Sequence, residues 1–324
     1  MFVAGFAAER GAAGGPAITD VRSFGYQLQR CSADRLQASP YDLLVVDAAN
    51  DYRDWLPSEV AAMRDGPCGP RLVLAYLSIG EAENYRWYWR DLPRDLLGYR
   101  SRGWPGNVHV RFWDPRWQSV IFGTPTGHTE SSLDRILDQG FDGVWLDRVD
   151  EFEVFGPRVI GGNGERPTAA IDMVAFVEGI ARHAREVRGR PGFLVVPQNG
   201  TSIGAPEAHV WAADPEAAAA DAEARWLAVI DGVGAEDTFF SGRRGGGDRF
   251  RPRADVIERL DRYRAAGKPV FAIDYVGTRR KVTRFRAACA AHGFVAFATR
   301  RALDRLGPGR YAPPLPGCDA DAAK

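Results

Sequence analysis

The residues Gly143-Val144-Trp145-Leu146-Asp147 form a short apolar run that ends in a carboxylate. Four more apolar runs lead into acidic residues in the same way, at Asp47, Glu81, Glu236-Asp237 and Asp274. Short runs rich in Val, Ile and Leu, separated by helical patterns, indicate parallel strands that are buried on both faces. Carboxylates at the ends of five such strands predict an acidic, chemically active floor at the carboxyl edge of a parallel sheet or barrel.

Eight strand candidates alternate with helical patterns along the 324 residues. They are the stretches 23–29, 43–47, 72–78, 143–147, 193–198, 229–233, 270–274 and 294–298. This alternation predicts an α/β fold, a single-domain (β/α)8 barrel of the TIM type over residues 21–306. We expect a flexible N-terminal segment at 1–20 and a surface tail at 307–324.

A ninth apolar stretch, residues 108–113, alternates between apolar and polar side chains. We interpret it as an extra strand in a long excursion after the third barrel strand. The alternative is that it is itself a barrel strand, in which case the first or the last assignment is wrong.

Composition excludes several classes of function. The chain has 42 basic and 42 acidic residues, so its net charge of zero gives no reason to expect nucleic-acid binding. No apolar run approaches the length of a membrane span. The four cysteines have no zinc-ligand spacing, and the five histidines include no metal-binding motif, so we expect no metal and no cofactor.

Other barrel chemistries also fit poorly. Lys268 precedes its strand and therefore lies at the wrong end for a Schiff base, and the serine-nucleophile motif GxSxG is absent. The remaining candidates for chemistry in this barrel are the carboxylates and the aromatic residues. Nine tryptophans are present, and most of them fall between Trp87 and Trp117. Flat rings pack against sugar faces and paired carboxylates hydrolyse glycosidic bonds. For any single tryptophan core packing is the better explanation, and the cluster as a whole favours sugar binding more than its members do.

Four motifs strongly resemble glycoside hydrolase family 114, the endo-α-1,4-polygalactosaminidase-like family of barrel enzymes. They are YLSIGEAE at 76–83 with Tyr85-Arg86 and Trp89, GFDGVWLD at 140–147 with Asp150, PQNG at 197–200 and DGVGAED at 231–237. The similarity covers roughly residues 24–298. It implies an endo-acting (β/α)8 glycosidase for α-linked galactosamine-containing polysaccharide. Members are typically exported, which predicts an extracellular location, although residues 1–16 lack the features of a signal peptide.

Motif by motif, the resemblance places the catalytic pair at Asp147 and Glu236. We assign Asp147 as nucleophile and Glu236 as general acid/base, with the reverse assignment left open. Asp237 and Trp145 are candidates for raising the pKa of the acid. A separation of about 5–5.5 Å between the carboxyl groups predicts retention of anomeric configuration, and about 6.5–9.5 Å predicts inversion.

The remaining candidates are expected to bind the substrate, a cationic amino-sugar polymer that an acidic floor would attract. They are Asp47, Tyr76, Glu81, Glu83, Trp113, Asp150, Gln198, Asn199, Asp237, Asp274 and Tyr275. For Glu81 and Glu83, ion pairing with Arg86 or Arg111 is an equally good explanation. Two other functions stay open: an inactive carbohydrate-binding or exopolysaccharide-associated barrel, and a proton-transfer isomerase with a second base or a metal.

Overall fold

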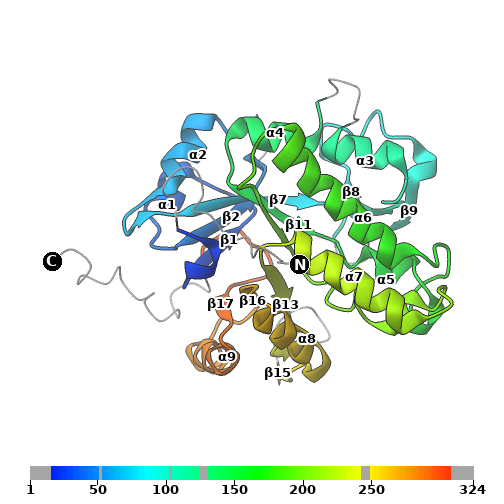
Figure 1. Ribbon diagram of the computed structural model, residues 1–324. Coiled ribbons are helices and arrows are strands. Elements are labelled where there is room, and N and C mark those ends of the chain that lie inside the picture. The colour runs from blue at the N-terminus through cyan, green and yellow to red at the C-terminus, as the bar shows by residue number, and fades with distance from the viewer. Residues whose placement is uncertain (1–15, 51–52, 102–103, 124–129, 242–248, 308–324) are drawn as a thin grey trace, which may run out of the picture.

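A computed structural model of the chain describes residues 16–50, 53–101, 104–123, 130–241 and 249–307 (Figure 1). Within these ranges, eight parallel strands form two sheets. The larger sheet has the order β1-β2-β7-β11-β12 and the smaller one β13-β16-β17. The strands are β1 Phe24–Gln27, β2 Leu43–Asp47, β7 Leu72–Ser78, β11 Gly143–Asp147, β12 Leu194–Pro197, β13 Val233–Glu236, β16 Val270–Asp274 and β17 Val295–Ala298.

The two sheets meet at two seams. At the first, Gln198 after β12 forms a parallel bridge with Gly234 of β13. At the second, β1 contacts β17, and the amides of Leu28 and Gln29 donate to the carbonyl of Leu303 beyond β17. In the described residues β1 and β17 share no strand ladder, so the eight strands are two sheets rather than one continuous hydrogen-bonded cylinder.

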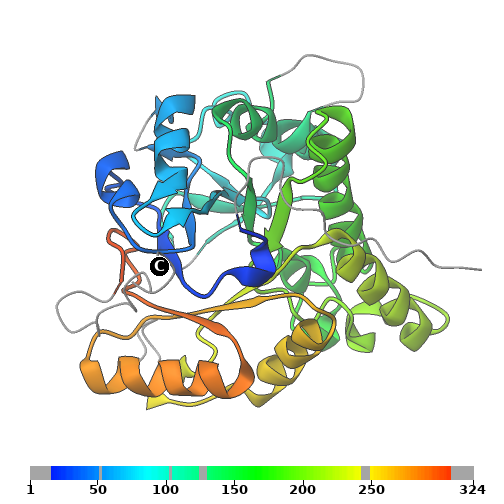
Figure 2. The same ribbon diagram turned by 60° about the vertical axis from the view of Figure 1, so that its left-hand side comes forward.

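Helices lie on the outside of the strands (Figures 1 and 2). Their ends follow the expected signals: the Ser131 hydroxyl accepts from the amide of Asp134 at the start of α4, and Gly140 adopts a left-handed conformation at its end. The helices are α1 Ala33–Gln37, α2 Pro57–Arg64, α3 Pro115–Phe122, α4 Ser132–Gln139, α5 Glu151–Phe155, α6 Ala169–Arg182, α7 Pro215–Val229, α8 Ala254–Ala265 and α9 Arg279–His292. A π-helical turn, His183–Val187, continues α6.

One predicted strand was misplaced. The stretch 229–233 was expected to be a strand, but α7 extends to Val229 and β13 begins only at Val233. Residues 229 and 230 are apolar because they are buried at the end of a helix. Gly234 is required in β13, because a Cβ at this position would lie 2.2 Å from the Trp145 ring. The shift places Glu236 as the last residue of its strand, as Asp147 is of β11.

Between β7 and β11 the chain forms a three-stranded antiparallel sheet of order β8-β10-β9. Its strands are β8 Glu81–Glu83, β9 Leu97–Arg100 and β10 Asn107–Val110, so part of the stretch 108–113 pairs here and not with the parallel strands. Three two-stranded hairpins complete the β-structure: β3 Ala49–Asn50 with β4 Arg53–Asp54, β5 Asp65–Gly66 with β6 Gly69–Pro70, and β14 Phe240–Ser241 with β15 Arg249–Phe250.

The interior between the sheets is aromatic. The buried ring of Trp145 packs against Phe24, Tyr26 and Phe271, which joins strands of both sheets. At the N-terminal side, Ile18–Asp20 forms a 3-10 turn with Ile18 buried in the core. The rest of the predicted N-terminal segment, residues 1–15, and the predicted tail from 308 lie outside the described residues. Among the described helices, none is both long and apolar enough to cross a membrane.

Candidate active site

Three neighbouring strands end in polar side chains that point into one cavity. Asp147 ends β11, Gln198 follows β12 and Glu236 ends β13. The next residue in each case has a left-handed backbone, with φ of 62° at Arg148, 62° at Asn199 and 50° at Asp237. Positive φ is uncommon outside glycine and clusters at functional sites, so the same sharp turn after three strands marks this edge of the sheet.

The cavity has a volume of about 660 Å³. Nine of the predicted site residues line it: Asp47, Tyr76, Glu81, Glu83, Asp147, Gln198, Asn199, Glu236 and Tyr275. They come from both sheets, so the cavity lies at the carboxyl ends of the parallel strands where barrel enzymes place their chemistry.

The side-chain amide of Gln198 bridges the two predicted catalytic carboxylates. Its Nε2 donates to Asp147 Oδ1 at 3.1 Å and to Glu236 Oε2 at 3.0 Å. The indole Nε1 of Trp145 donates to Gln198 Oε1 at 2.7 Å, which fixes the amide so that its NH₂ group faces the carboxylates. The sum of the two distances from Nε2, about 6 Å, is the most that can separate these carboxylate oxygens.

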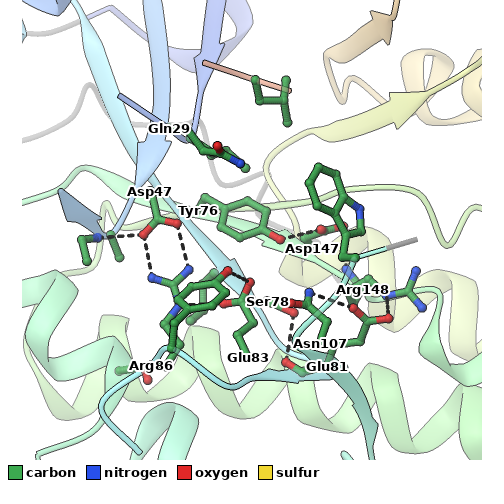
Figure 3. Close-up of a pocket in the computed structure, with 18 of the residues that line it drawn as sticks. Gln29, Asp47, Tyr76, Ser78, Glu81, Glu83, Arg86, Asn107, Asp147 and Arg148 are labelled. Carbon is green, nitrogen blue, oxygen red and sulfur yellow. Dashed lines mark hydrogen bonds and ion pairs between the residues drawn. The ribbon is translucent and has the colours of Figure 1, made fainter. Parts of the chain in front are cut away.

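Two tyrosines flank the pair. The hydroxyl of Tyr76 donates to Asp147 Oδ2 at 2.7 Å (Figure 3), and the hydroxyl of Tyr275 donates to Glu236 Oε1. Asn199 Nδ2 donates to Glu236 Oε2 at 3.2 Å, and its Oδ1 accepts from the Glu236 amide at 3.0 Å. Each carboxylate is therefore held by a tyrosine on one side and by the shared amide on the other.

The two carboxyl groups have perturbed acidity. Burial raises the pKa of Asp147 to about 7, with the negative charge of Glu236 as the next cause. Burial also raises the pKa of Glu236. Of the other charges, the Arg148 cation lowers the pKa of Asp147, whereas the Asp237 anion raises that of Glu236 more than Arg301 lowers it. Because the two buried acids lie this close, each disfavours the ionised form of the other and they titrate as a pair.

The predicted acidic floor is largely ion-paired. Arg86 binds Asp47 through both terminal nitrogens, at 2.7 and 2.8 Å, and binds Glu83 through Nε at 2.6 Å (Figure 3). The group thus carries two carboxylates for one guanidinium. Its net negative charge at the cavity wall is smaller than the sequence alone indicated.

A second ion-paired group lies beside Asp147. Glu81, His109 and Glu151 bring ligand-type atoms within 4.8 Å of one another. The guanidinium of Arg148 already contacts two of them, with Nε 3.1 Å from Glu81 and Nη2 2.9 Å from Glu151. A metal ion at this position would have to displace that cation, so the donor set fits the arginine better than a metal.

Four predicted binding residues are not among the described residues that line the cavity. Trp113 packs edge-on against Phe155, with ring centres 5.0 Å apart. Asp150 lies at the start of α5, 3.8 Å from Arg148. Asp237 pairs with Arg301 at 2.6 Å.

Asp274 is the fourth of these. Its two carboxylate oxygens accept from three backbone amides, those of Thr238, Phe239 and Phe240, at 2.9, 3.2 and 2.9 Å. It therefore holds the loop that follows β13, and it is fully buried.

Several cavity residues escaped the sequence reasoning. The ring of Tyr26, from β1, lies near both carboxylates, whose charges raise its pKa together with burial. Asn107 of β10 donates to Glu81 at 3.1 Å. Neither residue had a local signal: Tyr26 is level with Val45 and Leu74 in the sheet, two residues short of the level of Tyr76, and Asn107 lies outside the parallel strands.

The comparison with known families settles the kinship of the chain. Residues 7–309 match the glycoside-hydrolase family GH114. The chain belongs to glycoside hydrolase family 114. An uncharacterized protein of Deinococcus radiodurans is 33% identical over 300 residues, which cover 90% of this chain and 84% of that protein. The family resemblance seen in the motifs is confirmed.

Two solved glycosidase structures share the fold. The glycoside hydrolase domain of PelA from Pseudomonas aeruginosa superposes with a TM-score of 0.63 at 20% identity, covering 89% of this chain and 98% of that domain. Ega3 of Aspergillus fumigatus, in complex with galactosamine, gives a TM-score of 0.63 at 18% identity, covering 90% and 96%. At these identities the likeness establishes the fold.

Proposed function

We propose that this family 114 protein hydrolyses α-linked galactosamine-containing polysaccharide at internal bonds, with Asp147 and Glu236 as its two catalytic carboxylates. The observation that carries the proposal is the single amide of Gln198, which hydrogen-bonds both acids where they line the cavity. Two acids at this spacing, one protonated and one ionised, are what glycosidic bond cleavage requires.

The spacing favours retention of configuration. Oxygens no more than about 6 Å apart match the retaining class, at about 5–5.5 Å, and leave too little room for the water of the inverting class. In this mechanism a carboxylate attacks the anomeric carbon while the acid protonates the departing oxygen. The resulting glycosyl ester is then cleaved by a water molecule that the second residue deprotonates.

The charges next to each acid favour Asp147 as nucleophile and Glu236 as acid/base, whereas burial, which raises the pKa of Asp147 to about 7, favours the reverse assignment. The adjacent Arg148 cation favours the ionised form of Asp147, and the adjacent Asp237 anion favours the protonated form of Glu236. Azide rescue tests this assignment. Because azide replaces the missing nucleophile, Asp147→Gly should give a glycosyl azide of inverted configuration; an azide product of retained configuration would support the reverse assignment.

An amino-sugar substrate is supported by the family and by the galactosamine bound to Ega3. In this chain, the excess carboxylate of the Asp47, Glu83 and Arg86 group suits an ammonium group in the cavity. We therefore expect cleavage to fall with rising salt and with N-acetylation of the polymer.

We also propose that the eight parallel strands make one closed (β/α)8 barrel, a single domain over residues 21–306. The bridge between Gln198 and Gly234 and the contact between β1 and β17 support closure at the two seams. Amide hydrogen exchange at Phe24–Gln27 and Val295–Ala298 tests it: protection matching that of β2 is expected, and rapid exchange at this seam would contradict closure.

The decisive test of activity is a panel of amino-sugar polymers, read by mass spectrometry of the released fragments. Wild-type protein should release oligosaccharides of several lengths from α-linked galactosamine polymer, and Asp147→Asn and Glu236→Gln should release none. Binding without release by the wild type would favour an inactive carbohydrate-binding protein, and equal release by the variants would remove both residues from the mechanism.

A further inference from the structure

Three aromatic side chains at the cavity wall are unusually exposed. Tyr85, Trp87 and Trp104 are 54%, 44% and 42% exposed, and all three line the cavity that holds the carboxylate pair. By contrast, Trp117 and Trp145 are fully buried. A single exposed apolar side chain is ordinary, but three large rings around one cavity form a surface that water covers poorly.

Polar partners hold two of these rings in place. The Tyr85 hydroxyl donates to Glu83 Oε1 at 2.5 Å, and the Arg86 guanidinium lies 5.1 Å from the centre of the ring. The guanidinium of Arg135 lies 5.5 Å from the centre of the Trp87 ring and is itself bound to Asp54 at 2.7 Å. The Trp87 ring also packs edge-on against the buried ring of Tyr88, with ring centres 5.7 Å apart. Hydrogen bonds, cation–π contacts and this one ring contact therefore orient the exposed rings.

The rings come from one segment of the chain. All three lie in the segment between β8 and β10, whereas Glu236 ends β13 and Tyr275 directly follows β16. Galacto-configured sugars suit such a surface, since their axial hydroxyl leaves one ring face composed of C–H groups. That apolar face packs against an aromatic ring, as other apolar faces do.

We propose that Tyr85, Trp87 and Trp104 form an aromatic platform that binds sugar residues of the substrate beyond the bond being cleaved. The proposal rests on the proposed glycosidase function and deepens it. The platform contacts only sugar units that lie away from the bond being cleaved. Longer polysaccharide chains are therefore better substrates than short ones. The platform also selects against polymers whose rings present hydroxyls on both faces.

The test compares Trp87→Ala and Trp104→Ala with Trp211→Ala, in the Glu236→Gln background that holds substrate without cleaving it. Trp211 is a matched control, since it is 43% exposed but is not among the described residues that line the cavity. Calorimetry measures the affinity of each protein for a long α-1,4-galactosamine oligosaccharide and for the disaccharide. A thermal melt of each variant confirms its fold.

Each cavity variant should bind the long oligosaccharide about tenfold more weakly, with the disaccharide affinity and the Trp211→Ala protein unchanged. Trp87→Phe should retain most of the affinity, because it keeps an aromatic face. Unchanged affinity for the long chain, or an equal loss for both ligands, would overturn the platform.

The two proposals fail in distinguishable ways. If wild-type protein binds the long oligosaccharide but cleaves nothing, the proposed hydrolase activity is wrong, and the binding measurements still test the aromatic platform. If wild type cleaves the polymer and the tryptophan variants bind like their parent, the platform is wrong and hydrolysis stands.

Discussion

Asp147 and Asp274 occupy equivalent positions, each the last residue of a buried parallel strand, yet the fold uses them differently. Asp147 lines the cavity and is bound by the side chains of Tyr76 and Gln198 and by one backbone amide, that of Arg148. Asp274 is bound by three consecutive backbone amides of a neighbouring loop and is fully buried. A carboxylate held by side chains in a cavity is available to substrate, whereas one held by amides serves the scaffold.

The comparison teaches that a position at a strand end does not by itself decide what a carboxylate does. What separates the two acids is the identity of their partners, and those partners come from distant parts of the chain. Substitutions at the two positions should therefore separate activity from stability.

The largest effect is expected at the cavity position. Asp147→Ala should lower kcat by at least about a thousandfold, because the reaction loses one of its two carboxylates. Its melting temperature should stay close to that of the wild type, since removing one of two adjacent buried acids also relieves their repulsion. Turnover assays and calorimetric melts of the same preparation check both; activity within tenfold of wild type would contradict the assignment.

A smaller loss is expected when the shared amide is removed. Gln198→Ala should reduce kcat/KM about 10- to 100-fold, because both carboxylates lose a hydrogen bond that holds them in place. The loss should be greater in kcat than in KM, which steady-state kinetics on a defined oligosaccharide separates. An effect confined to KM would make Gln198 a binding residue only.

The pH profile should respond to Asp237. The pair must keep one proton to act, and burial raises the pKa of Asp147 to about 7, so kcat/KM of the wild type should fall as the pH rises above that value. Asp237→Asn removes an anion that raises the pKa of Glu236, so the proton is lost at lower pH. The alkaline limb of the kcat/KM profile should move to lower pH by a few tenths of a unit. An alkaline limb that is unchanged or moves to higher pH would show that Asp237 does not raise the pKa of Glu236.

The smallest effect on chemistry is expected at Asp274. Asp274→Ala leaves three amides without their acceptor and should destabilise the fold by about 2–4 kcal/mol. Turnover per folded molecule should change less than tenfold, because Asp274 does not contact the cavity. Urea unfolding measures the loss of stability, and kinetics normalised to the amount of folded protein measure turnover. A thousandfold loss of turnover in well-folded Asp274→Ala would contradict the claim that Asp274 and Asp147 have different roles.

Sequence reasoning located the strands well where they are apolar and short. The family motifs predicted the acid pair, and the structure brings Asp147 and Glu236 together, each as the last residue of its strand. It failed at 229–233, because apolar residues buried at the end of α7 resemble a strand, while the real strand, with Gly234 and Ala235, has weak strand character. The predicted alternative in which Arg86 pairs with Glu83 is confirmed. The second pair of Arg86, with Asp47, and the contact of Arg148 with Glu81 were out of reach, since they join segments that only the fold brings together.

Trp113 illustrates a different limit. The sequence analysis predicted that Trp113 binds substrate and made no such prediction for Trp87. In the structure the Trp113 ring packs on Phe155, and Trp87 lines the cavity. Which tryptophan of a cluster is buried depends on three-dimensional packing, and no local pattern encodes it.

The most direct measurement follows the anomeric proton of the first product by time-resolved NMR, with wild-type protein and an α-linked galactosamine oligosaccharide. Because Asp147 and Glu236 accept hydrogen bonds from the same nitrogen of Gln198, they are close enough for a retaining mechanism. We therefore expect the α-anomer to appear first and then to mutarotate. Initial release of the β-anomer would show that a water molecule fits between Asp147 and Glu236, and it would contradict the geometry from which the mechanism is drawn.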